Sequence, residues 1–200
     1  MLTFLLSMRS PGSVRRFLPR LARRKASAGS RAKSGATAIE FAMIAPIFFM
    51  LIFGLVEAGV IFIGQGVLQY ATEDVARQIR TGQVQTAGLN KVTFRNLVCS
   101  KLSAMLACDS NLTIDVDAFN NFQAANFHPP LDASGHLAAN LDNYNPGTAC
   151  DVVLVRTYYT WKVQTPVLTP FLVNMADNYQ LLSSAAAFRN EPFTSAVAGC

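Results

Sequence analysis

The sequence predicts an α+β fold anchored in a membrane: a long N-terminal transmembrane helix extends into a small domain with a second helix and a short antiparallel β-sheet. Two observations predict it, an unbroken apolar run at residues 41–63 and short alternating apolar segments in the second half of the chain. A third is composition, because the 200 residues are 51% hydrophobic and only 14% charged. This is too apolar for a simple soluble domain, and one long apolar run is too few for a polytopic membrane protein.

The apolar run at residues 41–63 is long enough to cross a membrane. It contains 23 residues and one charged side chain, Glu57. At about 1.5 Å per residue it spans about 34 Å, and a hydrocarbon core is about 30 Å thick. A buried core helix is the alternative, but the rest of the chain is too small to surround such a helix on all sides. We therefore predict one transmembrane helix near the N-terminus.

The distribution of charge predicts the direction of this helix. Nine of the 17 basic residues and no acidic residue lie in residues 1–35, which leaves 8 basic and 12 acidic residues for the remainder. The positive-inside rule then places the N-terminus in the cytoplasm and the C-terminal domain outside it. A secretory signal peptide fits poorly, because the apolar run is too long and no A-x-A site follows it promptly. The basic charge belongs to the leader, so we expect no nucleic-acid partner.

The helix is predicted to continue beyond the membrane. Apolar residues keep the helical spacing after the apolar run, and Gly82 is a suitable end. A helix over residues 36–81 would measure roughly 69 Å. We divide the chain into a basic cytoplasmic leader at 1–35, the helix with its extension at 36–82, and an α+β domain outside the cytoplasm at 83–200. The apolar stripe of the extension consists of Val67, Leu68, Ala71, Val75 and Ile79.

The periodicity of the C-terminal domain predicts a second helix followed by strands. Apolar spacing favours a helix over residues 91–107 and, after it, an alternating strand over residues 112–117. Residues 151–163 form the strongest predicted strand, and residues 180–189 form a third. Asn, Gly and Pro are frequent in residues 119–149, which predicts a long loop.

Four cysteines, all beyond the apolar run, predict disulfides in an oxidising compartment. A helix continuous through residue 107 would separate Cys99 from Cys108 by about 13.5 Å, whereas a disulfide needs Cα atoms within about 7 Å. Either that helix breaks before Cys108 or the partners are different. Three pairings remain open, and we favour Cys99 with Cys108 and Cys150 with Cys200.

No pattern of residues predicts catalysis or a bound cofactor. The only histidines, His128 and His136, lie in the predicted loop, and no Ser, Asp or Cys is placed to complete a recognisable triad. The spacing of Asp109, Asp115 and Asp117 could suggest a cation, but the latter two fit the solvent face of a strand. We therefore predict a protein that is not an enzyme and that holds neither a metal nor a cofactor.

The junction between leader and helix, RAKSGATAIEFAMIAP at residues 31–46, carries a family resemblance. A basic leader ends at Gly35, and Glu40 and Phe41 follow at the start of the apolar helix. This resembles the site at which a prepilin peptidase cuts type IV prepilins, here between Gly35 and Ala36. The finer pattern, Glu40-Phe41-Ala42 followed by Pro46, is similar to the TadE-like minor pilin (pseudopilin) family of the tight adherence (Tad/Flp pilus) system.

Two further segments, residues 80–83 and residues 189–193, also resemble that family, whereas residues 90–188 match it loosely. The Flp major pilin has Tyr after the glutamate and a much shorter chain, so Phe41 and the large domain favour a minor pilin. The related TadF and TadG subunits share this general plan.

The resemblance implies a subunit of the bacterial inner membrane with a periplasmic C-terminal domain, either at the base of a pilus or within it. It also implies a role in assembling or anchoring a Tad-type pilus. The expected partners are the prepilin peptidase, other pilins and the membrane proteins of pilus assembly. The alternative is a single-pass anchored periplasmic protein that binds a ligand or acts as an adhesin.

Two acidic residues of the predicted membrane helix need an explanation. After cleavage, Glu40 would lie about 6 Å along the helix from the new amino group of Ala36. An unpaired charge at depth costs about 2.5–3.5 kcal/mol, and the resemblance implies that the ammonium of a neighbouring subunit offsets this cost. Headgroup solvation near the helix N-terminus is the alternative. Glu57, about 25 Å further along, is expected at the outer interface, either solvated or paired with a partner subunit.

Overall fold

A computed structural model describes residues 28–102, 105–125, 127–165, 169–193 and 200, with residues 28–34 described by their backbone alone. Most of the predicted leader, residues 1–27, thus lies outside the described residues. The chain divides into two compact units, Met1–Met43 and Ile44–Cys200. What is described of the first unit is the start of one helix, and the second unit contains the remainder of that helix and the α+β domain.

The first helix, α1, extends over Ala28–Arg80 and continues through Pro46. It ends where the sequence predicts, just before Gly82, but it begins eight residues earlier than residue 36. The helix extends backwards because alanine, arginine and lysine, which account for four of residues 28–33, are all good helix formers. Gly35 therefore lies inside the helix in the uncleaved chain.

The predicted antiparallel sheet is confirmed. Its strands are β1 (Leu112–Phe119), β2 (Val152–Lys162) and β3 (Tyr179–Arg189), in the order β1-β2-β3. Both pairs are antiparallel, with Val155 opposite Val116 in β1 and opposite Ala186 in β3. The central strand β2 is therefore hydrogen-bonded along both of its edges.

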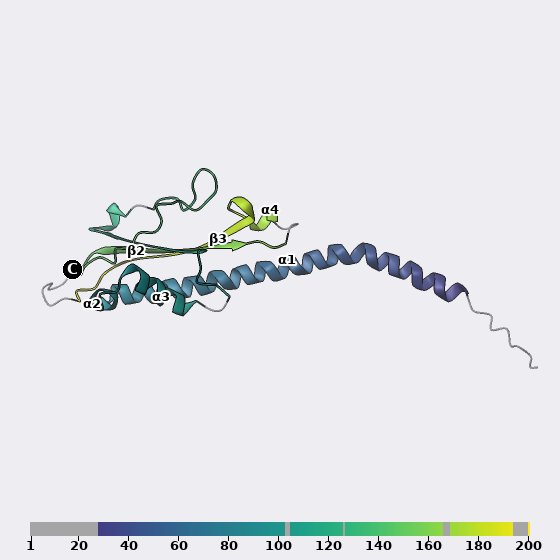
Figure 1. Cartoon of the computed structure of the whole chain (residues 1–200), viewed down its shortest axis with the longest axis horizontal. Helices are drawn as coiled ribbons and strands as arrows, with labels where there is room; N and C mark the ends of the chain where they lie inside the picture. Colours follow the sequence, from purple (N-terminus) through teal and green to yellow (C-terminus); the bar gives the residue numbers. More distant parts are fainter. Residues whose placement is uncertain (1–27, 103–104, 126, 166–168, 194–199) are drawn as a thin grey trace, which may run out of the picture. The chain divides into compact units, whose positions relative to one another are not determined.

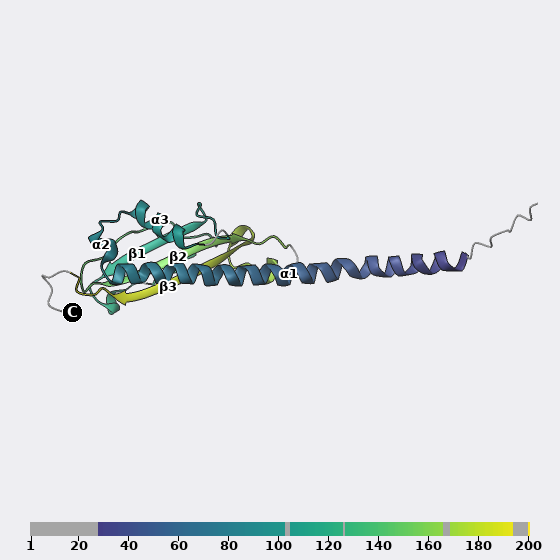
Figure 2. The same ribbon diagram turned by 90° about the horizontal axis from the view of Figure 1, so that it is seen from below.

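Helices cover one face of this sheet. Figures 1 and 2 show the second half of α1 running along it, beside the short helices α2 (Gln83–Thr86) and α3 (Lys91–Lys101). The predicted stripe of α1 is buried here, and Thr72 adds a buried hydroxyl contact of 2.5 Å to Thr157 of β2. The core between helices and sheet includes Leu68, Val75, Ile79, Val84, Phe94, Val98, Ile114, Val116, Val153, Val155, Tyr159 and Leu182.

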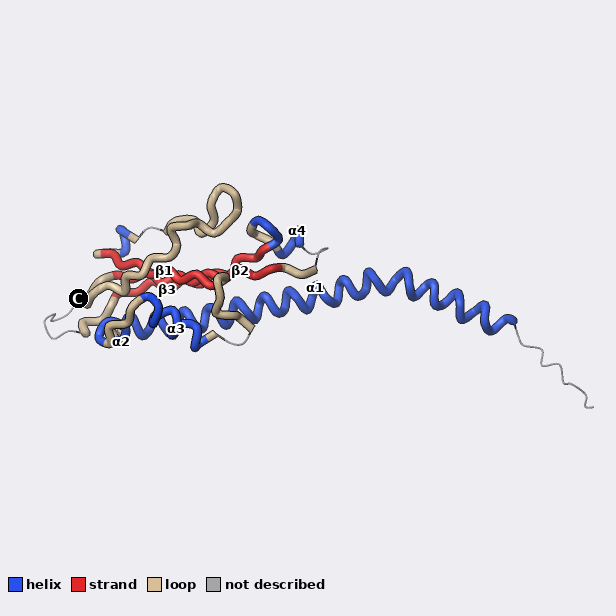
Figure 3. The backbone as a smooth tube through the Cα atoms, viewed as in Figure 1, coloured by secondary structure: helices blue, strands red, loops and turns tan. Residues whose placement is uncertain are grey.

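The long segment between β1 and β2 covers the opposite face, as the tan tube in Figure 3 shows. It contains the short 3-10 helix η1 (Phe122–Ala124), and its Leu141 packs against Tyr158 and Leu181 of the sheet. The prediction that Asp115 lies on a solvent-exposed face of the first strand is therefore wrong, because its side chain is fully buried. Its carboxylate accepts hydrogen bonds from Arg156 of β2 and from the backbone N–H of Asn143, so the buried charge is compensated.

The second predicted helix is shorter than the sequence indicates. Asn90 caps its start by accepting a hydrogen bond from the backbone N–H of Thr93, but α3 ends at Lys101 rather than at residue 107. The next residue, Leu102, is extended, and the chain then returns to bring Cys108 to Cys99 with Cα atoms 5.6 Å apart. The sequence predicts too long a helix because Leu106, which follows the helix, is also buried in the core and so extends the apolar spacing past Lys101.

Candidate functional site

The membrane-spanning part of α1 presents its side chains to the outside. Among the described residues, Gly35–Arg80 is the one helix that is long and apolar enough to cross a membrane. The large apolar side chains between Ile39 and Val56 are between 40% and 72% exposed, which is unusual for apolar side chains of a protein in water. Exposed apolar side chains on all sides of a helix indicate a lipid environment. We therefore identify α1 as a membrane anchor.

The predicted processing and assembly residues lie together at the start of this apolar surface. Gly35, Ala36, Glu40 and Phe41 are all exposed, Phe41 by 66%. A Cβ atom added to Gly35 would meet no other atom within 4 Å, so the space around this glycine is open. Ala36 and Glu40 are four residues apart on α1 and therefore share one side of the helix.

Glu57 occupies a position that neither sequence-based alternative anticipated. Its side chain is only 9% exposed, and it hydrogen-bonds within the chain. One carboxylate oxygen accepts the backbone N–H of Gln164 at 2.5 Å, and the other accepts that of Thr165 at 2.8 Å. These residues follow the end of β2 and are more than 100 positions away in sequence. Glu57 thus fastens the end of the sheet to α1.

Residues 80–83 and 189–193 meet at the opposite end of the sheet. Gly82, two residues after the end of α1, has a positive φ of 76°, and a Cβ atom placed there would lie 2.2 Å from the ring of Phe193. Only glycine allows both this backbone conformation and this approach. The backbone N–H of Glu191 donates to the carbonyl of Arg80, and the two side chains form an exposed ion pair at 3.2 Å.

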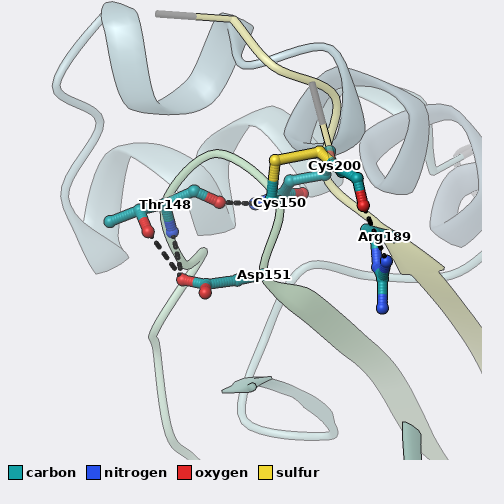
Figure 4. Close-up of a disulfide and its surroundings, with 6 residues drawn as sticks. Thr148, Cys150, Asp151, Arg189 and Cys200 are labelled. Carbon is teal, nitrogen blue, oxygen red and sulfur yellow. Dashed lines mark hydrogen bonds between the residues drawn. A yellow bond between two sulfur atoms is a disulfide. The ribbon is translucent and has the colours of Figure 1, made fainter. Parts of the chain in front are cut away.

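A disulfide and a buried amide stabilise the same end. Cys150 and Cys200 are bonded with Cα atoms 5.3 Å apart, and Figure 4 shows Arg189 donating to the carbonyl of Cys200 beside them. Asn190 is 1% exposed, and its amide donates to the carbonyls of Pro146 and Thr148. Both cysteine pairs are those favoured from the sequence.

The buried charges on the loop-covered face form a small cluster. The Arg156 guanidinium donates to Asp115 and, at 3.2 Å, to Asp117. Burial, and then the nearby Asp115 carboxylate, raise the pKa of Asp117 above its ordinary value, against the opposing effect of Arg156. Two carboxylates sharing one guanidinium stabilise the packing between β1 and β2.

The remaining candidate residues are not brought together. Among the described residues, no group of three or more His, Cys, Asp or Glu side chains could hold a metal ion. His136 lies in a turn in which its backbone N–H donates to Asp132, and Asp109 caps the turn before β1 through the backbone N–H of Asn111. The geometry of these residues is that of turn formation.

Comparison with known proteins agrees with the leader junction and with α1. No curated protein and no solved structure matches the chain. Residues 35–77 match the family model described as TadE-like protein, so the match begins at Gly35 and ends three residues before the end of α1. The resemblance to the TadE-like family is therefore confirmed over this segment, which suggests an association with the Tad pilus.

Proposed function

We propose that this protein is a minor pilin, or pseudopilin, that assembles or anchors a Tad-type pilus after a prepilin peptidase cuts it between Gly35 and Ala36. The observation that carries the proposal is that the family match and the exposed apolar surface of α1 begin at nearly the same place in the chain. The TadE-like match begins at Gly35, and the exposed apolar surface of α1 begins four residues later, at Ile39. A processing site at the membrane entry of an apolar helix is what pilin maturation requires. The role is structural rather than catalytic.

The proposed topology has the leader in the cytoplasm and the domain of residues 83–200 in the periplasm. The nine basic residues before the helix favour this direction. The two disulfides, both in the C-terminal domain, favour an oxidising compartment for that domain. The bacterial inner membrane is then the compartment boundary that α1 crosses.

Glu40 has the proposed role of pairing with the new ammonium of Ala36 on a neighbouring subunit. Its carboxylate is exposed on α1 beside Phe41, where a second helix could reach it. A charge-assisted hydrogen bond of this kind contributes about 1.5–3 kcal/mol. The pairing would align subunits at the depth of the leader junction.

Cleavage is tested by the mass of the mature chain in a host that contains the peptidase. We expect a product of residues 36–200, and we expect Gly35→Leu to remain full length. Because a side chain at Gly35 would enter open space, loss of cleavage would reflect recognition by the peptidase rather than a disturbed fold. Gly66→Leu is the matched control, since Gly66 is also open and on α1. A full-length wild-type protein would contradict the proposal.

Assembly is tested by Glu40→Gln, with piliation and mature protein quantified together. We expect normal insertion and cleavage but fewer surface pili, because the charge that would pair with the ammonium is absent. Glu57→Gln is a poor control, since Glu57 bonds two backbone amides within the chain. Glu73→Gln is better matched, because Glu73 is an exposed acid on the same helix. Normal piliation in Glu40→Gln would exclude the pairing role.

A further inference from the structure

An apolar groove lies beside Glu57, where the sheet ends against α1. Its volume is about 510 Å³, and α1 contributes one wall through Met50, Phe53, Val56 and Val60. The other wall is Trp161 near the end of β2 and the chain that follows it. The groove is thus open to a ligand that is largely apolar.

Glu57 fixes the depth of this groove relative to a bilayer. The 18 residues from Ile39 to Val56 would rise about 27 Å in an α-helix, close to the thickness of a hydrocarbon core. A carboxylate and the backbone amides of Gln164 and Thr165 are polar groups that favour the interface over the hydrocarbon. The outer boundary of the bilayer therefore falls next to Glu57, and the Met50 and Phe53 wall of the groove lies on the lipid side of it.

The short helix α4 (Thr169–Leu172) belongs to the same end of the domain. The Thr169 hydroxyl donates to the backbone carbonyl of Thr165. The backbone N–H of the same Thr165 donates to the Glu57 carboxylate. Figures 1 and 3 show α4 at the end of the sheet where β2 ends and β3 begins. Phe171 of α4 is 82% exposed, an unusual exposure for an aromatic side chain in water.

We propose that this end of the domain rests in the outer leaflet, with a phospholipid acyl chain in the groove beside Trp161 and with Phe171 inserted among the headgroups. The groove is continuous with the lipid-exposed surface of α1, so lipid already surrounds one of its walls. Aromatic side chains favour the interface, and the exposed Lys162 next to Trp161 suits a lipid phosphate. The inference rests on α1 crossing a membrane and is independent of the proposed role in a pilus.

The chain offers a direct probe, because Trp161 is its only tryptophan. The full-length protein is reconstituted in vesicles of phosphatidylcholine and phosphatidylglycerol whose acyl chains carry bromine at defined depths. We expect bromine near the glycerol to quench the fluorescence of Trp161 more strongly than bromine near the chain end. Iodide in the water should quench it weakly.

Two variants locate the contact. In a Trp161→Phe background, Phe171→Trp should also be quenched by shallow bromine. Phe122→Trp in the same background is the control: residue 122 follows the end of β1 that pairs with Val152, so it lies at the other end of β2 from Trp161. Its fluorescence should respond to iodide and not to brominated lipid.

The outcome that overturns the proposal is a wild-type Trp161 fluorescence unaffected by brominated lipid. If a second copy of the chain filled the groove, quenching would appear only when the protein is diluted in lipid, and this result would also overturn it. Neither measurement depends on pili, so failure here leaves the proposed function standing.

Discussion

The sheet is fastened to α1 at two ends, and the two attachments are built differently. On the membrane side one side chain, Glu57, holds the chain after β2 through two backbone amides. At the far end an ion pair, a backbone hydrogen bond, the approach of Phe193 to Gly82 and a disulfide act together. The far end is therefore redundant, whereas on the membrane side the chain after β2 is held by a single buried carboxylate.

The largest effect should come from removing the disulfide at the far end. Cys150→Ser with Cys200→Ser should lower the free energy of unfolding by about 2–5 kcal/mol, because the bond closes a long loop in the unfolded chain. Chemical denaturation of the full chain in detergent measures the loss. The matched control is Cys99→Ser with Cys108→Ser. Its residues are 9 apart instead of 50, so the loss should be smaller. Equal losses would mean that loop closure is not the cause.

Gly82→Ala should have the next largest effect, about 2–4 kcal/mol. It forces a side chain into a left-handed conformation and against the ring of Phe193, and each of these costs about 1–2 kcal/mol or more. Gly88→Ala separates the two causes, since Gly88 also has a positive φ but has open space around it. Both are measured by thermal unfolding. A loss in Gly88→Ala as large as that in Gly82→Ala would remove the contact with Phe193 from the explanation.

On the membrane side, Glu57→Gln should cost about 1–3 kcal/mol, because one of the two partly buried amides loses its charged acceptor. The loss should be local. Hydrogen exchange at the Gln164 and Thr165 amides should accelerate, while exchange within β2 should change little. Glu73→Gln, on the exposed side of α1, should leave both amides unchanged. Unchanged exchange in Glu57→Gln would show that the membrane-side attachment does not depend on this carboxylate.

The smallest effect concerns the exposed ion pair of the far end. A double-mutant cycle on Arg80→Ala and Glu191→Ala should give a coupling of about 0.2–1 kcal/mol that declines as salt is added. Both side chains are at least half exposed, so water and ions screen the interaction. The backbone bond from Glu191 to Arg80 persists in both variants. A coupling that resists high salt would place this pair among the main supports of the far end.

Local sequence patterns predict the helices and strands of this fold. The features that they do not predict depend on contacts between residues far apart in the sequence. The stripe of α1 and the alternation in β1 and β2 are set by neighbouring residues, so the sequence contains them directly. The ion pair of Asp115 with Arg156 joins residues 41 positions apart, and the loop that buries it has no periodicity of its own. The alternation alone therefore predicts a solvent-exposed Asp115, which the structure contradicts.

Some residues of the candidate site can likewise be identified from local sequence spacing, and others only from the structure. Gly35, Ala36 and Glu40 follow one another in the chain and could be identified from spacing alone. The contact between residues 80–83 and 189–193 could not be identified in this way, because the two segments lie more than 100 positions apart in the sequence. The role of Glu57 could not be predicted either, because its partners are backbone amides, which leave no signature in the sequence.

The course of α1 along the sheet has a mechanical consequence. Between Leu68 and Ile79 the helix packs side by side with the central strand, and it is fastened at both ends of this contact. A pulling force applied along the helix axis would load these contacts in shear, all at once, rather than peel them apart one after another. The helix and the sheet should therefore move as one rigid unit. Tension on the membrane segment should reach the far end of the domain without first extending the domain.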